Sequence, residues 1–290
     1  MDTVSPPAPP GHSPRPGAPR PARARPVRAA PQRPAAPRFQ RLRVLFALVI
    51  REMGMKFGRS LGGYFWAIAQ PLGGIVLLAI GFSLALRSPP LGTSFILFYA
   101  TGIIPFTIYT TMANGVSGAV RTNRGLLTYP VVTALDAILA KFVLNFMTIL
   151  MIGVGLSSGI ILILGLHVNL DLAAIAIAFT LAALVGLGVG TLNCVLFGFF
   201  PTWKNVWGVL TRPLFLLSGI FYVFEMVPAS FQALILWNPL IHVIGLMRSG
   251  FFGTYDPSYV SYPYVLGVAG GSFVLGAYLL RRHESHLIEQ

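Results

Sequence analysis

The chain has 290 residues, of which 55% are hydrophobic and only 10% are charged, and its mean hydropathy is +0.73. Because soluble domains carry about 25% charged residues, this composition excludes a soluble globular protein and predicts an all-α integral membrane protein. The net charge of +13 does not indicate a nucleic-acid groove, since twelve of the 21 Arg and Lys residues lie in residues 1–59. Cys194 is the single cysteine, which excludes a disulfide framework and a thiolate metal site.

Residues 1–38 contain twelve prolines among Ala and Arg, a composition that has nothing to bury and predicts a disordered cytoplasmic tail. The segment lacks the apolar region of a secretory signal. Two interpretations stay open: a solvated tail that helps keep the N-terminus in the cytoplasm, or a basic segment attracted to anionic lipid head groups.

Residues 39–60 predict a basic amphipathic helix that lies in the membrane interface. The alternative is a first span, but the apolar run Val44–Ile50 is too short to cross about 30 Å of hydrocarbon. The residues predicted to share the apolar face are Leu42, Leu45, Phe46, Val49 and Met53.

Six later segments reach about 20 residues and predict transmembrane helices within a membrane domain, 61–282. The predicted spans are 63–86, 95–116, 142–166, 172–200, 206–224 and 261–280. With the N-terminus inside, 18 basic residues fall on the cytoplasmic side and two outside, which predicts that both termini, including the tail 283–290, are cytoplasmic. The pairs Gly155/Gly159, Gly186/Gly190 and Gly267/Gly271 predict close helix packing.

The predicted cytoplasmic loop 117–141 is long and basic, and Thr133–Lys141 has helical character. It is either an ordinary connector or a docking helix for a cytoplasmic partner.

The predicted outside stretch 225–260 contains two ten-residue segments, Pro228–Trp237 and Pro239–Arg248. Each is about 15 Å long as a helix, or half a bilayer. Asn238 suits an N-cap and Pro239 the first helical position. The pattern predicts a pair of reentrant half-helices between spans five and six.

Catalytic and nucleotide-binding patterns are absent from the sequence. No lysine follows a phosphate-binding Gly-rich loop, no His pair has metal-ligand spacing, and the carboxylates are scattered. Arg212 is the only charge clearly inside a predicted span, about two turns from its cytoplasmic end. The chain is therefore not predicted to be an enzyme, and if it transports a substrate, a separate subunit is expected to supply the energy.

Four segments together resemble the ABC-2-type permeases of capsular polysaccharide exporters. The first is FGRSLGGYFWAIAQPL, with a basic residue and Ser before Leu-Gly, then Trp, then Gln-Pro. The others are TGIIPFTIY, YPVVTALDAILAKF, and LSGIFYVFEMVP followed by WNPLIHVIGLMR. They occur in the family's order within residues 39–282. The tail 1–38 departs from the family pattern.

The resemblance implies a homodimer of six-span protomers in the bacterial inner membrane that moves lipid-linked polysaccharide from cytoplasm to periplasm. ATP and Mg would be held by a separate ABC ATPase subunit, with no cofactor on this chain, and periplasmic or outer-membrane export proteins would be further partners. Alternatives are an ABC-2 permease for O-antigen, teichoic acid or drugs, a secondary carrier, or a structural membrane anchor. No nucleic acid is expected as a partner.

The resemblance also suggests three groups of site residues. The candidates for the cargo path and its cytoplasmic opening are Arg59, Ser60, Tyr64, Trp66, Gln70, Tyr99, Phe106, Tyr109, Arg212, Phe221 and Tyr222. The candidates for ATPase docking are Arg121, Arg124 and Asp136. The candidates for a periplasmic gate are Glu225, Trp237, Asn238, His242 and Arg248. The competing interpretations are an aromatic belt or packing for the rings, a solvated loop for the docking residues, and snorkelling for Arg212.

Overall fold

A computed structural model describes residues 38–57, 62–128 and 132–283, with only the backbone described for 38–41, 56–57 and 62–64. The predicted tail 1–38 therefore lies almost wholly outside the described residues. Within the described ranges all regular structure is helical and no strand occurs, which confirms the predicted all-α class.

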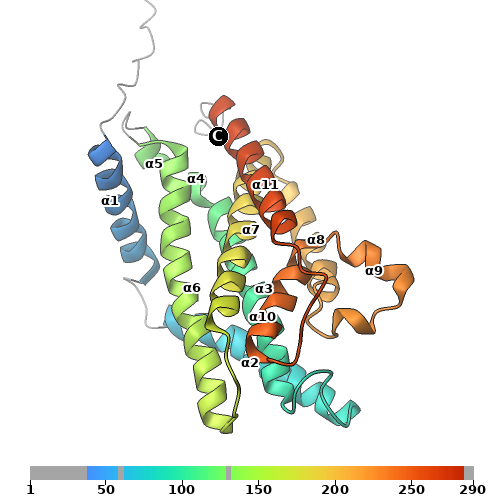
Figure 1. Ribbon diagram of the computed structural model, residues 1–290. Helices are drawn as coiled ribbons and strands as arrows, with labels where there is room; N and C mark the ends of the chain where they lie inside the picture. Colours follow the sequence, from blue (N-terminus) through green and yellow to red (C-terminus); the bar gives the residue numbers. More distant parts are fainter. Residues whose placement is uncertain (1–37, 58–61, 129–131, 284–290) are drawn as a thin grey trace, which may run out of the picture. The chain divides into compact units, whose positions relative to one another are not determined.

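The helices follow one another along the chain with short connections (Figure 1). They are α1 Arg38–Phe57, α2 Gly62–Ala85, α3 Phe95–Ser117, α4 Ala119–Thr122, α5 Arg124–Leu127, α6 Ala134–Leu164, α7 Leu172–Phe199, α8 Trp203–Leu217, the 3-10 helix η1 Phe224–Met226, α9 Ala229–Ile235, α10 Pro239–Phe251 and α11 Tyr262–Arg282. Among the described residues, five helices are long and apolar enough to cross a membrane: α2, α3, α6, α7 and α11. The pair α9 and α10, bent by 102°, adds a sixth candidate if it is counted as one broken span.

The fifth predicted span, 206–224, was too long. Helix α8 has 15 residues and ends at Leu217, so its length is about 22 Å and short of the hydrocarbon thickness. The chain turns at once, because Gly219 adopts a positive φ of 79°. Asn238, twenty residues on, donates hydrogen bonds to the Leu217 carbonyl (3.3 Å) and to Ser218 Oγ (3.1 Å), which satisfies polar groups at the end of α8.

Helix α6 begins earlier than the predicted span 142–166. Thr133 and Asp136 form a capping box: the Thr133 hydroxyl accepts from the Asp136 N–H (3.2 Å), and the Thr133 N–H donates to Asp136 Oδ2 (3.0 Å). The resulting 31 residues give about 46 Å of helix, which exceeds the hydrocarbon thickness. The additional turns carry Asp136 and Lys141, the charged residues of α6.

Small residues set the packing at the centre of the bundle. A Cβ on Gly186 would lie 2.5 Å from Met112 Cβ and one on Gly190 would lie 2.8 Å from the Ala113 carbonyl, so α7 contacts the backbone of α3. A Cβ on Gly188 would overlap the Ala269 carbonyl oxygen, so α7 also contacts the backbone of α11. Of the three predicted glycine pairs, Gly186/Gly190 is thus a packing site, whereas the other two pairs have no heavy atom within 4 Å of a built Cβ.

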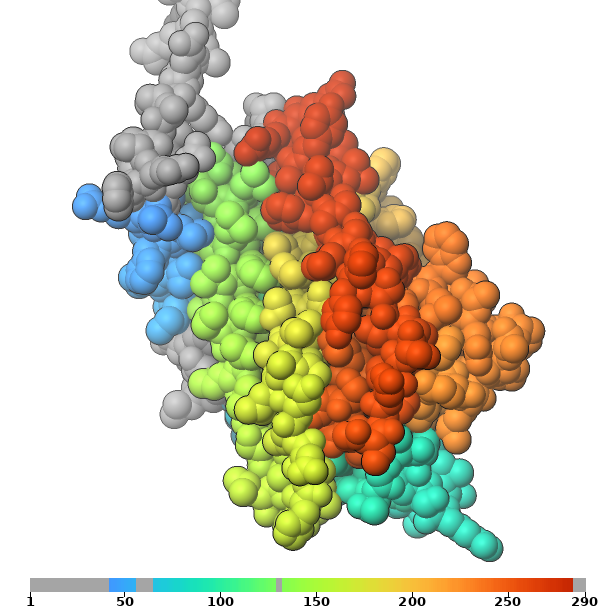
Figure 2. Space-filling view, viewed as in Figure 1, coloured from blue at the N-terminus to red at the C-terminus, as the bar shows by residue number. Residues whose placement is uncertain are grey.

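The outward faces of α6, α7 and α11 lie side by side (Figure 2). Large apolar side chains are exposed there, as expected for a surface whose solvent is lipid. Among them are Met147, Met151, Leu162, Val274 and Leu275.

The connections gather at two ends, as the predicted topology requires. At one end the Asp171 N–H donates to the Gly250 carbonyl (2.9 Å), and Gly92 packs against the Phe252 ring. At the other end the rings of Phe199 and His283 lie 5.0 Å apart. Figure 1 shows α5 and the end of α11 at the top, and the loop between α2 and α3 at the bottom.

The α3–α7 contact predicts opposite effects for two glycine substitutions. Gly186→Ala places a methyl group against Met112 and should destabilise the protein by about 1–3 kcal/mol, because an overpacked contact forces the backbones apart. The control, Gly155→Ala, adds a methyl group in open space and should be neutral or slightly stabilising. The unfolding midpoint in detergent measures both, and equal midpoints would contradict the packing.

Candidate functional site

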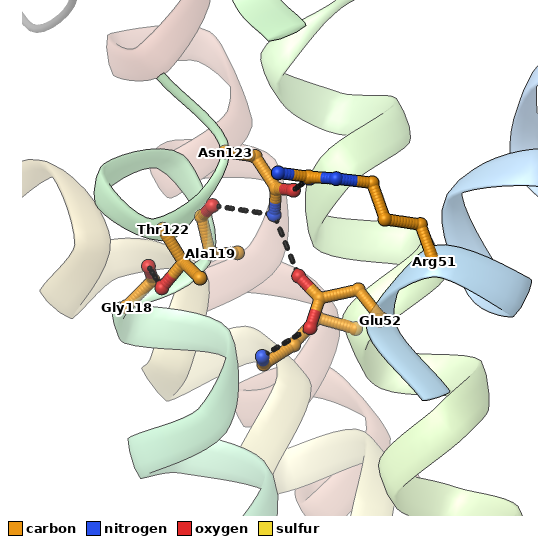
Figure 3. A network of polar contacts seen from close by, with 7 residues as sticks. Arg51, Glu52, Gly118, Ala119, Thr122 and Asn123 are labelled. Atoms are coloured by element: carbon orange, nitrogen blue, oxygen red, sulfur yellow. Dashed lines mark hydrogen bonds and ion pairs between the residues drawn. The ribbon is translucent and has the colours of Figure 1, made fainter. Parts of the chain in front are cut away.

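A buried carboxylate joins the interface helix α1 to the rest of the chain (Figure 3). Glu52 is 1% exposed, and its Oε2 lies 2.5 Å from Lys141 Nζ of α6. Its Oε1 accepts a hydrogen bond from Asn123 Nδ2 (2.7 Å), between α4 and α5. Arg51 in turn donates to Asn123 Oδ1 (2.6 Å). We call these four residues the Glu52 network; they connect α1 to two segments that lie 71 and 89 residues further along the chain from Glu52.

The orientation of α1 explains why Glu52 is buried. Leu42, Phe46 and Met53 are more than half exposed, on the side expected to face lipid, whereas Leu48 and Glu52, four residues apart, point into the protein. The amphipathic helix was predicted, and its exposed apolar residues include three of the five expected. The burial of Glu52 was not predicted. The signal in the sequence was a lone acid within a strongly basic helix, but its partner lies too far along the chain to be paired by inspection.

A cavity of about 570 Å³ lies between α2, α3, α6 and α8. Its lining is mostly apolar but includes a group of uncharged polar side chains, for which we call it the neutral polar cavity. Two predicted path residues, Gln70 and Phe106, line it. The other polar lining residues are Thr107, Thr110, Thr111, Asn114, Asn145 and Thr148, and none of the described lining residues is charged. Hydroxyl and amide groups at membrane depth can exchange hydrogen bonds with water or with the hydroxyl groups of a ligand without holding it through charge. The threonines recur at helical spacing along α3 and were not among the predicted path residues.

The other predicted path residues do not line this cavity. Tyr99 and Tyr109 are 0% and 3% exposed and belong to the apolar core, because α3 is surrounded by other helices. Phe221 packs edge-on against Phe215, at 5.3 Å between ring centroids. Tyr222 contributes its carbonyl to a hydrogen bond described below.

Two further path candidates are exposed on the surface. Trp66 of α2 is 69% exposed and has Phe65 as its ring neighbour, while Arg212 is exposed on α8. Arg59 and Ser60, together with the side chain of Tyr64, lie outside what the structure describes. The path roles of all these residues stay predictions.

The predicted docking residues fall in two places. Arg121 and Arg124 line a second cavity, of about 660 Å³, together with Lys204 at the start of α8. Asp136 is half-buried and caps α6, and its Oδ2 accepts from both the N–H and the hydroxyl of Thr133. The cap gives Asp136 a structural role, and docking by these residues stays a prediction.

At the predicted gate, the chain breaks where expected. Asn238 caps α10 by accepting from the Leu240 N–H (3.0 Å), and Pro239 occupies the first turn. His242 is 4% exposed; its Nδ1 accepts from the Ser261 N–H (3.3 Å), which assigns the proton to Nε2, and Nε2 donates to the Leu236 carbonyl (3.1 Å). Trp237 is 77% exposed, and its carbonyl accepts from the Tyr264 hydroxyl (2.6 Å).

Arg248, predicted in the outside stretch at the flank of the gate, is buried on α10, and its gate role stays a prediction. The side chain is 1% exposed and lies 4.2 Å over the Phe98 ring. Its guanidinium donates to the carbonyls of Tyr222 (2.7 Å) and Ile220 (3.1 Å). These carbonyls lie in the irregular turn after α8, where no helical partner is available, so a buried donor satisfies them. Arg248 fastens this turn to α10.

Glu225, the other flank of the predicted gate, is exposed and accepts from the Tyr255 hydroxyl at 3.1 and 3.2 Å. The Tyr259 hydroxyl lies 3.3 Å from that of Tyr255. Burial raises the pKa of Tyr259 to about 12, so this hydroxyl stays protonated at neutral pH. The three side chains tie the turn before α9 to the loop before α11.

Residues 43–252 match the family described as "ABC-2 type transporter". The polysialic acid transport protein KpsM of Escherichia coli is 28% identical over 243 residues, which cover 83% of this chain and 94% of KpsM. The capsule polysaccharide export inner-membrane protein BexB of Haemophilus influenzae is 27% identical over 220 residues, 76% of this chain and 83% of BexB. The protein of that description named CtrC, from Neisseria meningitidis serogroup B, is 28% identical over 214 residues, 73% of this chain and 80% of CtrC. The family match includes the Glu52 network, both cavities and the break at Asn238.

The Glu52 network predicts a non-additive pair of substitutions. Lys141→Leu leaves a buried carboxylate without its cation and should destabilise the protein by about 3 kcal/mol. Adding Glu52→Leu removes that carboxylate, so the double variant should unfold at a higher temperature than Lys141→Leu alone. Arg43→Leu, an exposed cation on the same helix, is the control and should have little effect. Additive shifts of the unfolding midpoint would show that the two side chains do not act as a pair.

Proposed function

The chain belongs to the ABC-2 type transporter family, and from this premise we propose that it is the permease subunit of an ATP-driven exporter of lipid-linked capsular polysaccharide. The observation that carries the proposal is the similarity to three capsule or polysialic acid transport proteins, each covered over at least 80% of its length. The cargo moves from the cytoplasm to the periplasm across the bacterial inner membrane.

The neutral polar cavity supports this cargo. A glycan presents many hydroxyl groups, and Thr107, Thr110, Thr111 and Asn114 offer matching donors and acceptors on one helix. Because the described lining residues carry no charge, sugar units are held weakly and can be replaced by the next unit along the chain. A polymer that must keep moving requires such weak binding.

The energy comes from a separate ABC ATPase subunit, which holds ATP and Mg. The sequence has no phosphate-binding loop of its own. The ATPase docks on α4, α5 and the first turn of α6, through the predicted contacts at Arg121, Arg124 and Asp136. The Glu52 network joins this surface to α1, so displacement of the docking segment is passed to the interface helix.

The charge distribution orients the protein in the membrane. Both termini and the Glu52 network lie on the cytoplasmic side in this proposal, which the 18-to-2 division of basic residues supports. The bent pair α9 and α10 then forms the periplasmic gate as two reentrant helices, next to the periplasmic or outer-membrane export proteins that continue the route. A second copy of the chain packs against the uncovered apolar faces of α2 and α8, which expose Leu77, Leu84 and Val209.

The cargo assignment is tested in a strain that lacks this gene. Surface polysaccharide should be lost and polysaccharide should accumulate inside the cell, because synthesis continues without export. The wild-type gene should restore the surface layer. Increased drug sensitivity with a normal surface layer would contradict the assignment and favour drug efflux.

Within that strain, Thr110→Leu should reduce export several-fold, because it replaces a hydroxyl in the polar cavity with a larger apolar group. The matched control is Thr180→Leu: Thr180 also bonds to the carbonyl four residues before it, but it is exposed on α7. Quantified surface polysaccharide, normalised to the amount of permease in the membrane, measures the effect. Equal export by the two variants would show that the cavity is not on the path.

A further inference from the structure

The second cavity, of about 660 Å³, lies where four segments meet. The end of α3, the turns α4 and α5, the end of α7 and the start of α8 all contribute to its lining. Arg121 and Arg124 come from one segment and Lys204 from another, and the three cations line the same hollow. We call it the basic cavity.

The charge of the basic cavity is uncompensated within the described part of the chain. No carboxylate is among its lining residues, and none of the three cations forms an ion pair with a described residue. The Nε of Arg124 is buried and has no hydrogen-bond partner there. A buried donor without an acceptor is unfavourable, and guanidinium groups bind phosphate oxygens through paired hydrogen bonds. The cavity therefore has the chemistry of an anion site.

The cavity also has an apolar wall. Val120, Cys194, Phe197 and Trp207 line it beside the cations. It lies at the ends of the membrane helices α3 and α7, where head groups meet hydrocarbon, and Trp is favoured at this depth. Basic residues at a membrane edge often snorkel separately into water, whereas these three converge on one hollow.

We propose that the basic cavity binds the phosphate group of a membrane lipid through Arg121, Arg124 and Lys204. The apolar part of the lipid lies along Phe197 and Trp207. Two sources share this chemistry: a bulk anionic phospholipid, and the phosphate-bearing lipid that carries the cargo. Only the second source rests on the proposed function.

The test titrates the purified full-length chain in detergent with defined probes, and native mass spectrometry counts the bound lipid. The probes are phosphatidylglycerol, phosphatidylcholine, a polyprenyl phosphate and inorganic phosphate. The site variant is Arg121→Gln, Arg124→Gln and Lys204→Gln. The control carries Arg43→Gln, Arg281→Gln and Arg282→Gln, which removes the same net charge from exposed residues outside the cavity.

The wild type and the control should bind at least one of the two anionic lipids about tenfold more tightly than phosphatidylcholine, and the site variant should lose this preference. Stronger binding of polyprenyl phosphate identifies the carrier lipid as the source, and stronger binding of phosphatidylglycerol identifies bulk lipid. The single variant Lys204→Gln, at an exposed position, should weaken binding about threefold. It tests the proposal if the triple variant fails to fold.

Two results would overturn the proposal. One is equal lipid binding by the site variant and the wild type, which would leave the cations to ATPase docking alone. The other is an equal loss in the site variant and the control, which would indicate bulk electrostatics. Capsule export is measured in a separate experiment. If the cargo assignment fails there, the binding of phosphatidylglycerol still tests the basic cavity.

Discussion

The buried Glu52 carboxylate determines how the interface helix meets the membrane domain. An isolated buried carboxylate costs several kcal/mol, so α1 is stable only where both oxygens have partners. Lys141 and Asn123 supply those partners from α6 and from the turn between α4 and α5. The requirement fixes one position of α1 and makes the helix, the turn and the start of α6 a single unit. In the proposed exporter this unit lies between the ATPase and the membrane.

Three cavities share one lining residue, Asn114 of α3. Asn114 lines the neutral cavity, the basic cavity and a third cavity of about 480 Å³ next to Glu52 and Lys141. The neutral cavity extends along α3 toward the middle of the bundle, while the basic cavity opens at the ends of α3 and α7. The proposed functions of these spaces agree: a cationic site suits the phosphate of the lipid, and an uncharged groove suits the sugars attached to it. The bent pair α9 and α10, proposed as the periplasmic gate, is fastened by Arg248 and Asn238.

Much of the fold was predictable because lipid offers no hydrogen bonds to the backbone, so the chain must satisfy its own polar groups. Long apolar segments must form helices, so composition alone identified the cores of α2, α3, α6, α7 and α11. The break at Asn238 was predictable because capping depends on neighbouring residues. The end of α8 was not, since it is stabilised by a side chain twenty residues away. For the same reason the partners of Glu52 and the burial of Arg248 were missed. Tyr99 and Tyr109 are aromatic residues that the sequence could not assign to core or path, and the structure places both in the core.

The most direct test of the account reconstitutes the permease in proteoliposomes together with its ATPase subunit and follows lipid-linked polysaccharide across the bilayer. The account predicts movement to the opposite face only when ATP and an active ATPase are present, and none when the ATPase is inactivated by substitution of its phosphate-binding lysine. Movement of the polysaccharide by the permease alone, without any ATP-binding partner, would contradict the account.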